Sequence, residues 1–294
     1  MKIFVTGATG FIGSAISAEL LHAGHDVLGL ARNDAAATKL KAAGVTPHPG
    51  DVQDHASLRS GAEQSDGVLH LGFIHDFSRF AEMCEVDRRA VLALGEALAG
   101  THKPLLIASG TALPAGHPVT EDSRASAGSS NPRVATERAG DELAAKGIRA
   151  GFLRFPPSVH GPGDHGFLAI LGELAKQKGF SAYVEDGANA WAAVHRLDAG
   201  VAGGRAIASD FTPGTRFHVV AEEAVPFRRI AEAIGDKLGL PARSIPKEEA
   251  AEHFTWFAHF ASMDGAASAA KTREYLGWTP SHPGLLADIA ASYF

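Results

Sequence analysis

Short apolar runs alternate with helically spaced apolar residues over about the first 155 residues of the chain. In the helical stretches apolar side chains return every three or four positions, whereas the short runs are typical of buried strands. The expected strands are Lys2–Val5, Asp26–Leu30, Val45–His48, Gly67–Leu71, Pro104–Ser109 and Ala150–Arg154. The expected helices between them are Phe11–Ala23, Ala35–Ala43, His55–Ala62, Phe80–Leu98 and Val134–Lys146. This alternation predicts an α/β fold in which helices cover both faces of a parallel sheet.

The pattern becomes less regular after Gly161. Helical spacing returns in Phe167–Lys178 and Arg196–Ile207, and most of Pro226–Phe294 also favours helix. The expected extended segments are Ser181–Val184, Ala192–Val194 and Thr215–Val220. We expect Thr215–Val220 to rejoin the sheet, and the polar stretch Thr120–Pro132 to form a surface loop.

A glycine-rich turn joins the first strand to the first helix. Thr6-Gly7-Ala8-Thr9-Gly10-Phe11-Ile12-Gly13 follows the apolar run Ile3-Phe4-Val5 directly. Gly7 permits the tight turn, Gly10 allows close approach of a pyrophosphate, and Gly13 lets the helix pack on the strand. The free N–H groups and the positive end of the helix dipole then face the phosphates. We expect a dinucleotide site here, formed by Gly7, Thr9, Gly10, Phe11, Ile12 and Gly13.

Composition narrows the kinds of partner. A net charge of −6 gives no basic surface for nucleic acid or for an anionic membrane, and no apolar run has the length of a membrane-spanning helix. The single cysteine, Cys84, excludes an intramolecular disulfide, and a strand this close to residue 1 leaves no room for a cleaved signal peptide. We therefore expect a cytoplasmic protein that binds a small-molecule substrate, as a monomer or a homodimer. No metal site is expected, because the histidines do not show the usual ligand spacings.

Further motifs follow the glycine turn in a recognisable order. Gly50-Asp51-Val52 follows the third strand, His70-Leu71-Gly72-Phe73 ends the fourth, and Leu276-Gly277-Trp278-Thr279-Pro280 lies near the C-terminus. Between them stands Arg154-Phe155-Pro156-Pro157-Ser158-Val159-His160-Gly161-Pro162-Gly163. Together with the spacing TGxxGxxG, this order resembles extended and atypical short-chain dehydrogenases/reductases of the NAD-dependent epimerase/dehydratase type.

The resemblance implies a Rossmann-type doubly wound sheet with a smaller, mostly helical substrate lobe. The nucleotide domain would comprise residues 1–156 and 195–220, and the substrate lobe residues 157–194 and 221–294. Further cofactor contacts are expected at Asp51, Val52, Leu71, Gly72, Phe73, Pro156 and Ser158.

The end of the second strand distinguishes between the two nicotinamide cofactors. A carboxylate there would bind the ribose 2′-hydroxyl of NAD, whereas an arginine accommodates the 2′-phosphate of NADP. The strand ends in Ala31-Arg32-Asn33, so the carboxylate is missing and a guanidinium follows. We expect NADP(H), with Arg32 as its ligand. NAD(H) is the alternative, if Arg32 is only a solvated loop residue.

The catalytic Tyr-x-x-x-Lys pair of this superfamily is missing from the sequence. The tyrosines are Tyr183, Tyr275 and Tyr293, and none is followed by a lysine four residues later. On the helix where the pair is expected, Arg133 stands at the tyrosine position, Thr136 at a serine position and Glu137 at the lysine position. An arginine does not act as an acid near neutral pH, and a glutamate inverts the charge of the lysine.

Three other residues are candidates for proton transfer: Thr111, His75 and, in reserve, His160. Thr111 follows the fifth strand, although Ser109 is an equally plausible register and either hydroxyl can simply cap the strand end. His75 follows the fourth strand, but Asp76 can N-cap the next helix and leave His75 as a loop residue. Similarly, Trp191 matches a stretch that borders the substrate in the family, yet it also suits plain packing.

Two functions remain open. The first is an NADP(H)-dependent oxidoreductase or epimerase-like enzyme that acts on a small carbonyl or hydroxyl compound with a substituted acid–base set. The second is a regulatory protein that binds the nicotinamide cofactor and senses redox state without turnover. The polar, histidine-rich segments favour the enzyme, and the missing dyad favours the sensor.

Overall fold

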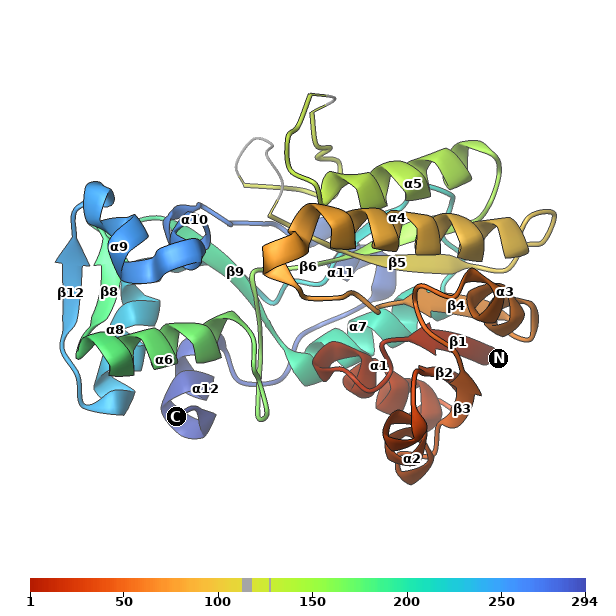
Figure 1. Cartoon of the computed structure of the whole chain (residues 1–294), viewed down its shortest axis with the longest axis horizontal. Helices are drawn as coiled ribbons and strands as arrows, with labels where there is room; N and C mark the ends of the chain where they lie inside the picture. Colours follow the sequence, from red (N-terminus) through yellow and green to blue (C-terminus); the bar gives the residue numbers. More distant parts are fainter. Residues whose placement is uncertain (113–117, 127) are drawn as a thin grey trace.

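A seven-stranded parallel sheet forms the larger part of the molecule (Figure 1). The computed structural model describes residues 1–112, 118–126 and 128–294. The strand order is β10-β6-β5-β4-β1-β2-β3, which reverses between β1 and β4, as in doubly wound nucleotide-binding domains. The strands are β1 (Lys2–Thr6), β2 (Asp26–Ala31), β3 (Thr46–Pro49), β4 (Gly67–His70), β5 (Leu105–Gly110), β6 (Ala150–Phe155) and β10 (Arg216–His218).

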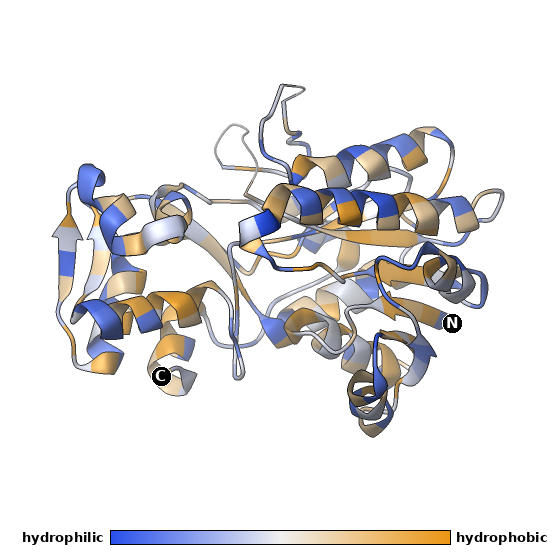
Figure 2. Cartoon of the chain, in the orientation of Figure 1, coloured by the Kyte–Doolittle hydropathy of each residue, from blue (hydrophilic) through white to orange (hydrophobic). Residues whose placement is uncertain are grey.

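Helices cover both faces of this sheet. One face carries α1 (Phe11–His22), α2 (Asp34–Ala42) and α7 (Arg196–Ala208), and the other carries α3 (His55–Glu63), α4 (Phe80–Ala97) and α5 (Val134–Ala145). Each face has its own apolar core, with Ile16 and Leu20 of α1 wholly buried on one side and Val91 and Leu94 of α4 wholly buried on the other. Figure 2 shows the resulting pattern, with apolar strands between helices whose outer faces are polar.

The expected strands and helices of the nucleotide domain are confirmed, and their ends shift by only one or two residues. β1 extends to Thr6 because Thr6 pairs with His70 of β4. The late strand also forms within the predicted segment: β10 pairs in parallel with β6 and closes the sheet edge. The fold is therefore the expected Rossmann-type α/β architecture.

A smaller lobe stands beside the sheet, and the C-terminus lies in it (Figure 1). Its elements are β7 (Ser158–His160), α6 (Phe167–Lys178), β8 (Ser181–Val184), β9 (Ala190–His195), β11 (Glu222–Pro226), α8 (Phe227–Leu238), β12 (Ala242–Ile245), η2 (Lys247–Glu249), α9 (Ala250–Phe254), η3 (Thr255–Phe257), α10 (Ala258–Ser262) and α12 (Leu285–Ser292). Its core is built around Trp191, Phe227 and Phe257, all wholly buried. Trp191 thus packs inside the lobe, as the simpler of its two interpretations expected.

The last third of the chain contributes to both parts of the molecule. α11 (Ala270–Leu276) packs against β10 and α7, and Trp278 joins the apolar core on the α1 face of the sheet. The expected domain boundary at residue 221 remains a prediction, and residues 270–278 lie with the sheet. In the part of the chain that the structure describes, no helix combines the length and the apolar character needed to cross a membrane.

Candidate active site

The predicted cofactor residues gather at the carboxyl edge of the sheet because all seven strands run in the same direction. A Cβ atom built on Gly7 would lie 2.8 Å from the backbone nitrogen of Gly72, so the segments after β1 and β4 touch. A Cβ atom on Gly72 would in turn lie 3.1 Å from Cγ1 of Val52, in the segment after β3. Residues predicted from three separate stretches of sequence therefore form one surface.

The glycine turn has the geometry that its sequence predicts. Gly7 adopts a left-handed conformation with φ of +71°. A side chain on Gly13 would overlap the carbonyl oxygen of Gly7, so α1 lies directly on the turn. Gly10, by contrast, is exposed, and among the described residues a Cβ atom there would meet only the Gly7 carbonyl oxygen, at 3.1 Å. The backbone is thus crowded on its inner side and open at Gly10.

The amino end of α1 is suited to a pyrophosphate. Its N-cap residue is Gly10, which brings no side-chain oxygen to the N–H groups of the first turn, and this turn contains no acidic residue. Lys39 of α2 donates a hydrogen bond to the carbonyl oxygen of Thr9 at 2.8 Å and places a positive charge beside the turn. Arg196 of α7 donates to Oγ of Ser14 at 2.9 Å, and its guanidinium lies 4.7 Å from the Phe11 ring centroid. These residues fit a dianionic diphosphate.

Arg32 occupies an exposed position between β2 and α2. The next residue, Asn33, caps α2 by accepting a hydrogen bond from the backbone N–H of Ala36 at 2.9 Å. The backbone on either side of Arg32 is therefore fixed while its guanidinium faces solvent. A phosphate bound near the end of β2 would lie within reach of this side chain.

At the first dyad position, Arg133 belongs to a buried polar chain that we call the Asp87 network. Arg133 Nη1 lies 2.6 Å from Asp87 Oδ2, and Thr136 donates to the same oxygen. The other oxygen of Asp87 lies 3.0 Å from Nε2 of His70, whose Nδ1 is 2.8 Å from Oγ1 of Thr6. Burial pushes the pKa of Asp87 upward, but Arg133 and His70 outweigh it and bring the pKa to about 2. The charge of Arg133 is thus neutralised by a permanent carboxylate.

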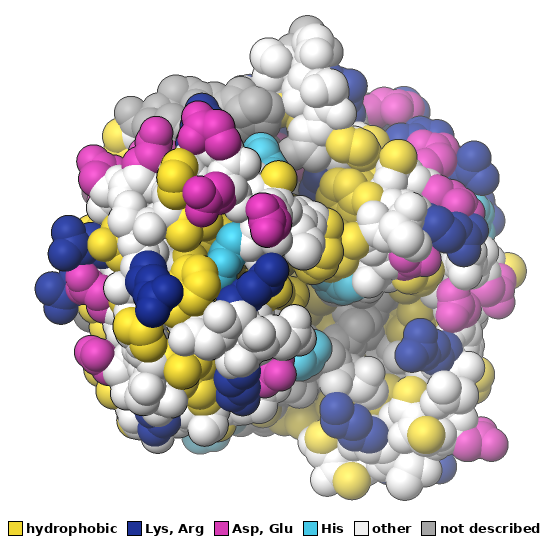
Figure 3. Space-filling view, turned by 60° about the vertical axis from the view of Figure 1, so that its left-hand side comes forward, with side chains coloured by type: hydrophobic (Ala, Val, Ile, Leu, Met, Phe, Trp, Pro, Cys, Tyr) yellow, Lys and Arg dark blue, Asp and Glu magenta, His cyan; other side chains and the backbone are white. Residues whose placement is uncertain are grey.

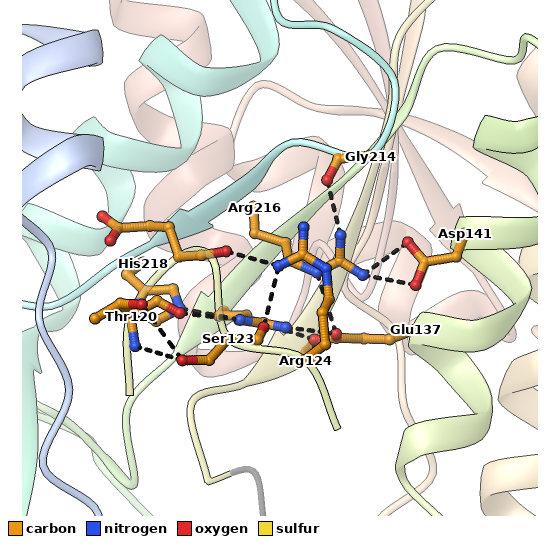
Figure 4. Close-up of polar contacts among 11 residues, drawn as sticks. Thr120, Ser123, Arg124, Glu137, Asp141, Gly214, Arg216 and His218 are labelled. Atoms are coloured by element: carbon orange, nitrogen blue, oxygen red, sulfur yellow. Dashed lines mark hydrogen bonds and ion pairs between the residues drawn. The ribbon is translucent and has the colours of Figure 1, made fainter. Parts of the chain in front are cut away.

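At the lysine position, Glu137 lies at the centre of a second buried group, the Glu137 cluster. Arg154 of β6, which is wholly buried, bonds to both carboxylate oxygens at 2.8 and 2.7 Å. Arg216 of β10 approaches at 3.4 Å and bonds to both oxygens of Asp141 at 2.7 Å (Figure 4). Burial raises the pKa of Glu137, but Arg154 and the hydroxyl of Ser109 outweigh this and hold the pKa below its usual value.

Neither dyad position therefore offers a proton. Arg133 and Glu137 are both ion-paired, and Ser109 is also committed because its hydroxyl donates to Glu137. Of the two registers considered at the end of β5, only Thr111 keeps an uncommitted hydroxyl. Its N–H donates to the Phe155 carbonyl oxygen at 2.9 Å, while Oγ1 is buried and finds no hydrogen-bond partner among the described residues.

His75 lies in an exposed position beside Arg133. Its ring packs at 5.1 Å from that of Phe73, and the Phe73 ring lies 4.4 Å beneath the Arg133 guanidinium. Partial burial and, after it, the nearby Arg133 charge lower the pKa of His75. Asp76 does cap the following 3₁₀ turn, η1 (Phe77–Arg79), by accepting from the N–H of Ser78 at 3.1 Å. The capping interpretation is confirmed, and the Phe73 ring connects His75 to Arg133 at the first dyad position.

His160 is placed differently from the other two candidates. It is wholly buried, and its Nδ1 lies 2.8 Å from Oδ2 of Asp288 in α12. The loop that follows is held by Tyr293, whose hydroxyl donates to Asp164 at 2.6 Å and accepts from the N–H of Gly161 at 3.1 Å. Nδ1 is therefore committed to Asp288, whereas Nε2, like Oγ1 of Thr111, is buried without a hydrogen-bond partner among the described residues. His160 stays the reserve candidate.

Sequence reasoning missed Lys39, Asp87 and Arg196. The contact between Arg196 and Ser14 joins positions 182 residues apart, and Asp87 lies 46 residues before Arg133. Contacts between residues so far apart cannot be recognised from a local pattern in the sequence. Figure 3 shows a hollow between the two lobes, with hydrophobic and histidine side chains at its margins.

Comparison with known proteins gives three findings. A model of the NAD dependent epimerase/dehydratase family matches residues 3–200. An uncharacterized protein of Schizosaccharomyces pombe is 46% identical over 297 residues, and the match covers 100% of both chains. A 3-diazoavenalumate denitrifying reductase of a Streptomyces species is 28% identical over 302 residues, covering 96% of this chain and 97% of that protein.

A solved structure extends the likeness to the fold of the whole chain. The dTDP-glucose 4,6-dehydratase DesIV of Streptomyces venezuelae, with NAD bound, has a TM-score of 0.77 at 19% identity. The alignment covers 100% of this chain and 96% of that one.

Proposed function

Since the chain belongs to the NAD dependent epimerase/dehydratase family, we propose that it is an NADP(H)-dependent oxidoreductase that reduces small carbonyl compounds. The observation that carries this proposal is the open amino end of α1 behind the exposed Gly10, beside a hollow between two lobes. NADP(H) is favoured by Arg32, because this exposed arginine follows β2 where a carboxylate would favour NAD(H).

Reduction of a carbonyl requires a hydride at carbon and a proton at oxygen. The reduced nicotinamide supplies the hydride when it is bound. The proton must come from this chain or from water, and Arg133 and Glu137 are unsuited because each is held in an ion pair.

Thr111 and His75 are the proposed polar partners of the carbonyl oxygen. The Thr111 hydroxyl, uncommitted among the described residues, would donate a hydrogen bond to that oxygen. The exposed imidazole of His75 exchanges protons with solvent and would restore the proton that the alkoxide takes. A reductive reaction is also the one named for the 3-diazoavenalumate reductase, which the chain resembles over nearly its full length.

The second candidate function is a redox sensor that binds the cofactor without turnover. One specific observation favours it: both dyad positions are neutralised by partners on other elements, Arg133 by Asp87 and Glu137 by Arg154. Such a protein would bind NADPH tightly and reduce nothing.

The experiment that tests the proposal follows NADPH consumption with aldehydes, ketones and quinones in the wild type and in three single variants. Arg133→Ala is expected to lower kcat by less than about tenfold, whereas Thr111→Val and His75→Ala are expected to lower it by about a hundredfold or more. NADPH affinity, measured by titration calorimetry, should be unchanged in the Thr111 and His75 variants. This would show that the loss of kcat comes from the chemical step and not from weaker cofactor binding.

Two results would contradict the proposal in different ways. If Arg133→Ala loses far more activity than the other two variants, the acid–base assignment is wrong. If no carbonyl compound is reduced although NADPH binds tightly, the redox-sensor function replaces the enzyme.

A further inference from the structure

A row of aromatic side chains runs from the dyad position to the smaller lobe. It begins at Phe73, whose ring lies under the Arg133 guanidinium, and continues through His75 to Phe77. Phe77 then stacks on Trp256 of η3, with ring centroids 4.7 Å apart and ring planes inclined by 27°. We call Phe73, His75, Phe77 and Trp256 the aromatic row. It joins the segment after β4 to the smaller lobe.

The outer half of this row is exposed, which is unusual for such side chains. Phe77 is 36% exposed and Trp256 50%, whereas Trp191 and Trp278 are 0% and 2% exposed. Neighbouring rings pack against the pair: Phe80 stacks on Phe77 at 5.8 Å, and Phe257 meets Trp256 edge to face at 5.5 Å. The exposed rings are therefore held in defined positions by packing.

The backbone beside Trp256 is strained. Thr255 has φ of +55°, in the left-handed region that β-branched residues avoid. Strain of this kind persists only where the surrounding structure enforces it, and it tends to occur at functional sites. Here it sets the direction in which the chain presents Trp256 toward Phe77.

We propose that the aromatic row selects planar aromatic carbonyl compounds as substrates, with Phe77 and Trp256 as the specificity-determining residues. This inference rests on the proposed function, whose substrate class it names. Flat rings stack on Phe and Trp faces and gain energy beyond the area that they bury, whereas saturated rings of the same size do not. The ring of the substrate would pack against the exposed pair and direct its carbonyl group along the row toward His75 and the dyad position.

The other groups along the row suit such a compound. His75 and Arg133 lie at its inner end and can hydrogen-bond to a carbonyl oxygen or to a phenolic group. The contact with the smaller lobe at this point is the stacked pair of Phe77 and Trp256.

The test compares flat and saturated ligands of equal carbon number. Binding of naphthamide and of decahydronaphthamide, neither of which carries a reducible aldehyde or ketone, is measured by titration calorimetry on the NADPH-loaded enzyme. Two aromatic contacts predict that naphthamide binds about tenfold more tightly or better. The kcat/KM values for benzaldehyde and cyclohexanecarbaldehyde should show the same preference, mainly through KM.

Three variants and one control test which residues cause the preference for aromatic ligands. Phe77→Leu and Trp256→Leu keep an apolar side chain and should reduce the aromatic preference to about threefold or less. Thr255→Gly relieves the strain and should raise the melting temperature while it also weakens the preference, because Trp256 is then less fixed. Tyr275→Leu, which removes an exposed aromatic residue of α11, should change neither ligand ratio.

The outcomes separate this inference from the proposed function. An aromatic preference in binding that Phe77→Leu and Trp256→Leu abolish supports the inference, even if no carbonyl is turned over and the proposed catalysis therefore fails. Reduction of both aldehydes with equal efficiency, or a preference that persists in both variants, overturns the inference and leaves the proposed reductase function intact.

Discussion

At the residue scale, the proposed preference for NADP(H) depends on the charge at the end of β2. Arg32→Ala should weaken NADPH binding by about tenfold to a hundredfold, because a charge-assisted contact with the 2′-phosphate contributes roughly 1.5–3 kcal/mol. NADH binding should hardly change, since that cofactor lacks the phosphate. Titration calorimetry with both cofactors measures the difference.

Arg59→Ala is the matched control for this prediction. Arg59 is also an exposed arginine of the nucleotide domain, but it pairs with Glu96 on the surface. Its removal should leave both affinities unchanged. Equal losses of NADPH and NADH affinity in Arg32→Ala would show that Arg32 does not bind the 2′-phosphate.

At the same scale, the sequence predicted the glycine turn and the absence of the Tyr-x-x-x-Lys pair. It did not predict the residues that form ion pairs with Arg133 and Glu137. The turn is a local motif, so Gly7, Gly10 and Gly13 could be interpreted from neighbouring residues alone. The partner of Arg133 is 46 residues away, and Arg216 is 79 residues from Glu137. Such pairings depend on which strands become neighbours, and only the structure supplies that information.

At the scale of elements, Gly10 and Gly13 lie at the same turn, but an added side chain should have a different effect at each position. Gly10→Val should abolish NADPH binding and leave the circular dichroism spectrum unchanged, because the exposed side chain blocks the pyrophosphate and not the fold. Gly13→Ala should instead destabilise the protein by about 1–3 kcal/mol in urea, because its Cβ atom displaces α1 from Gly7. Full NADPH affinity in Gly10→Val would place the dinucleotide elsewhere.

The Glu137 cluster joins α5 to β6 and β10, so the loss of one of its charges should weaken the packing of these three elements. Glu137→Gln should lower the free energy of unfolding by about 3–5 kcal/mol, because the wholly buried Arg154 loses its counter-charge. Urea denaturation measures this loss.

Glu142→Gln is the control on the same helix. Glu142 pairs with Lys146 at the surface, with half of its side chain exposed, and the loss of such a pair costs about 0.5 kcal/mol or less. Equal effects of the two substitutions would mean that the buried cluster adds nothing to stability.

Element positions followed from the hydrophobic pattern because strands buried on both faces are uniformly apolar. The smaller lobe was less predictable. Ala190–Trp191, at the start of β9, was outside the expected strand, and β12 fell within a region expected to be mostly helical. β12 pairs in parallel with β8, which precedes it by about 60 residues, so its extended form depends on a distant partner.

At the scale of the whole molecule, buried histidines make stability depend on pH. Burial lowers the pKa of His218 from 6.5 to about 4; Glu121 opposes this shift and Arg154 adds to it. Its Nδ1 donates to the Ser268 carbonyl oxygen at 2.7 Å while Nε2 faces Arg154 at 3.3 Å, so the neutral ring fits this site.

Because the folded pKa of His218 is below the unfolded one, the unfolded chain takes up the proton first as the pH falls. The stabilisation is present above pH 6.5 and is lost as the pH falls toward 4. Between pH 7 and pH 5 the free energy of unfolding should fall by about 2 kcal/mol from this residue. Urea denaturation at both values should show a smaller fall in His218→Gln, and an equal fall would assign the dependence to other groups.

The Glu137 cluster also constrains how this protein can evolve. A change of Glu137 to lysine would place a third cation between Arg154 and Arg216, in a site that excludes water. A single substitution of Glu137 toward the family dyad therefore passes through a chain that folds poorly. The chain is separated from the tyrosine–lysine chemistry by an epistatic barrier, so new activity is more accessible through the residues that face the hollow than through reversion.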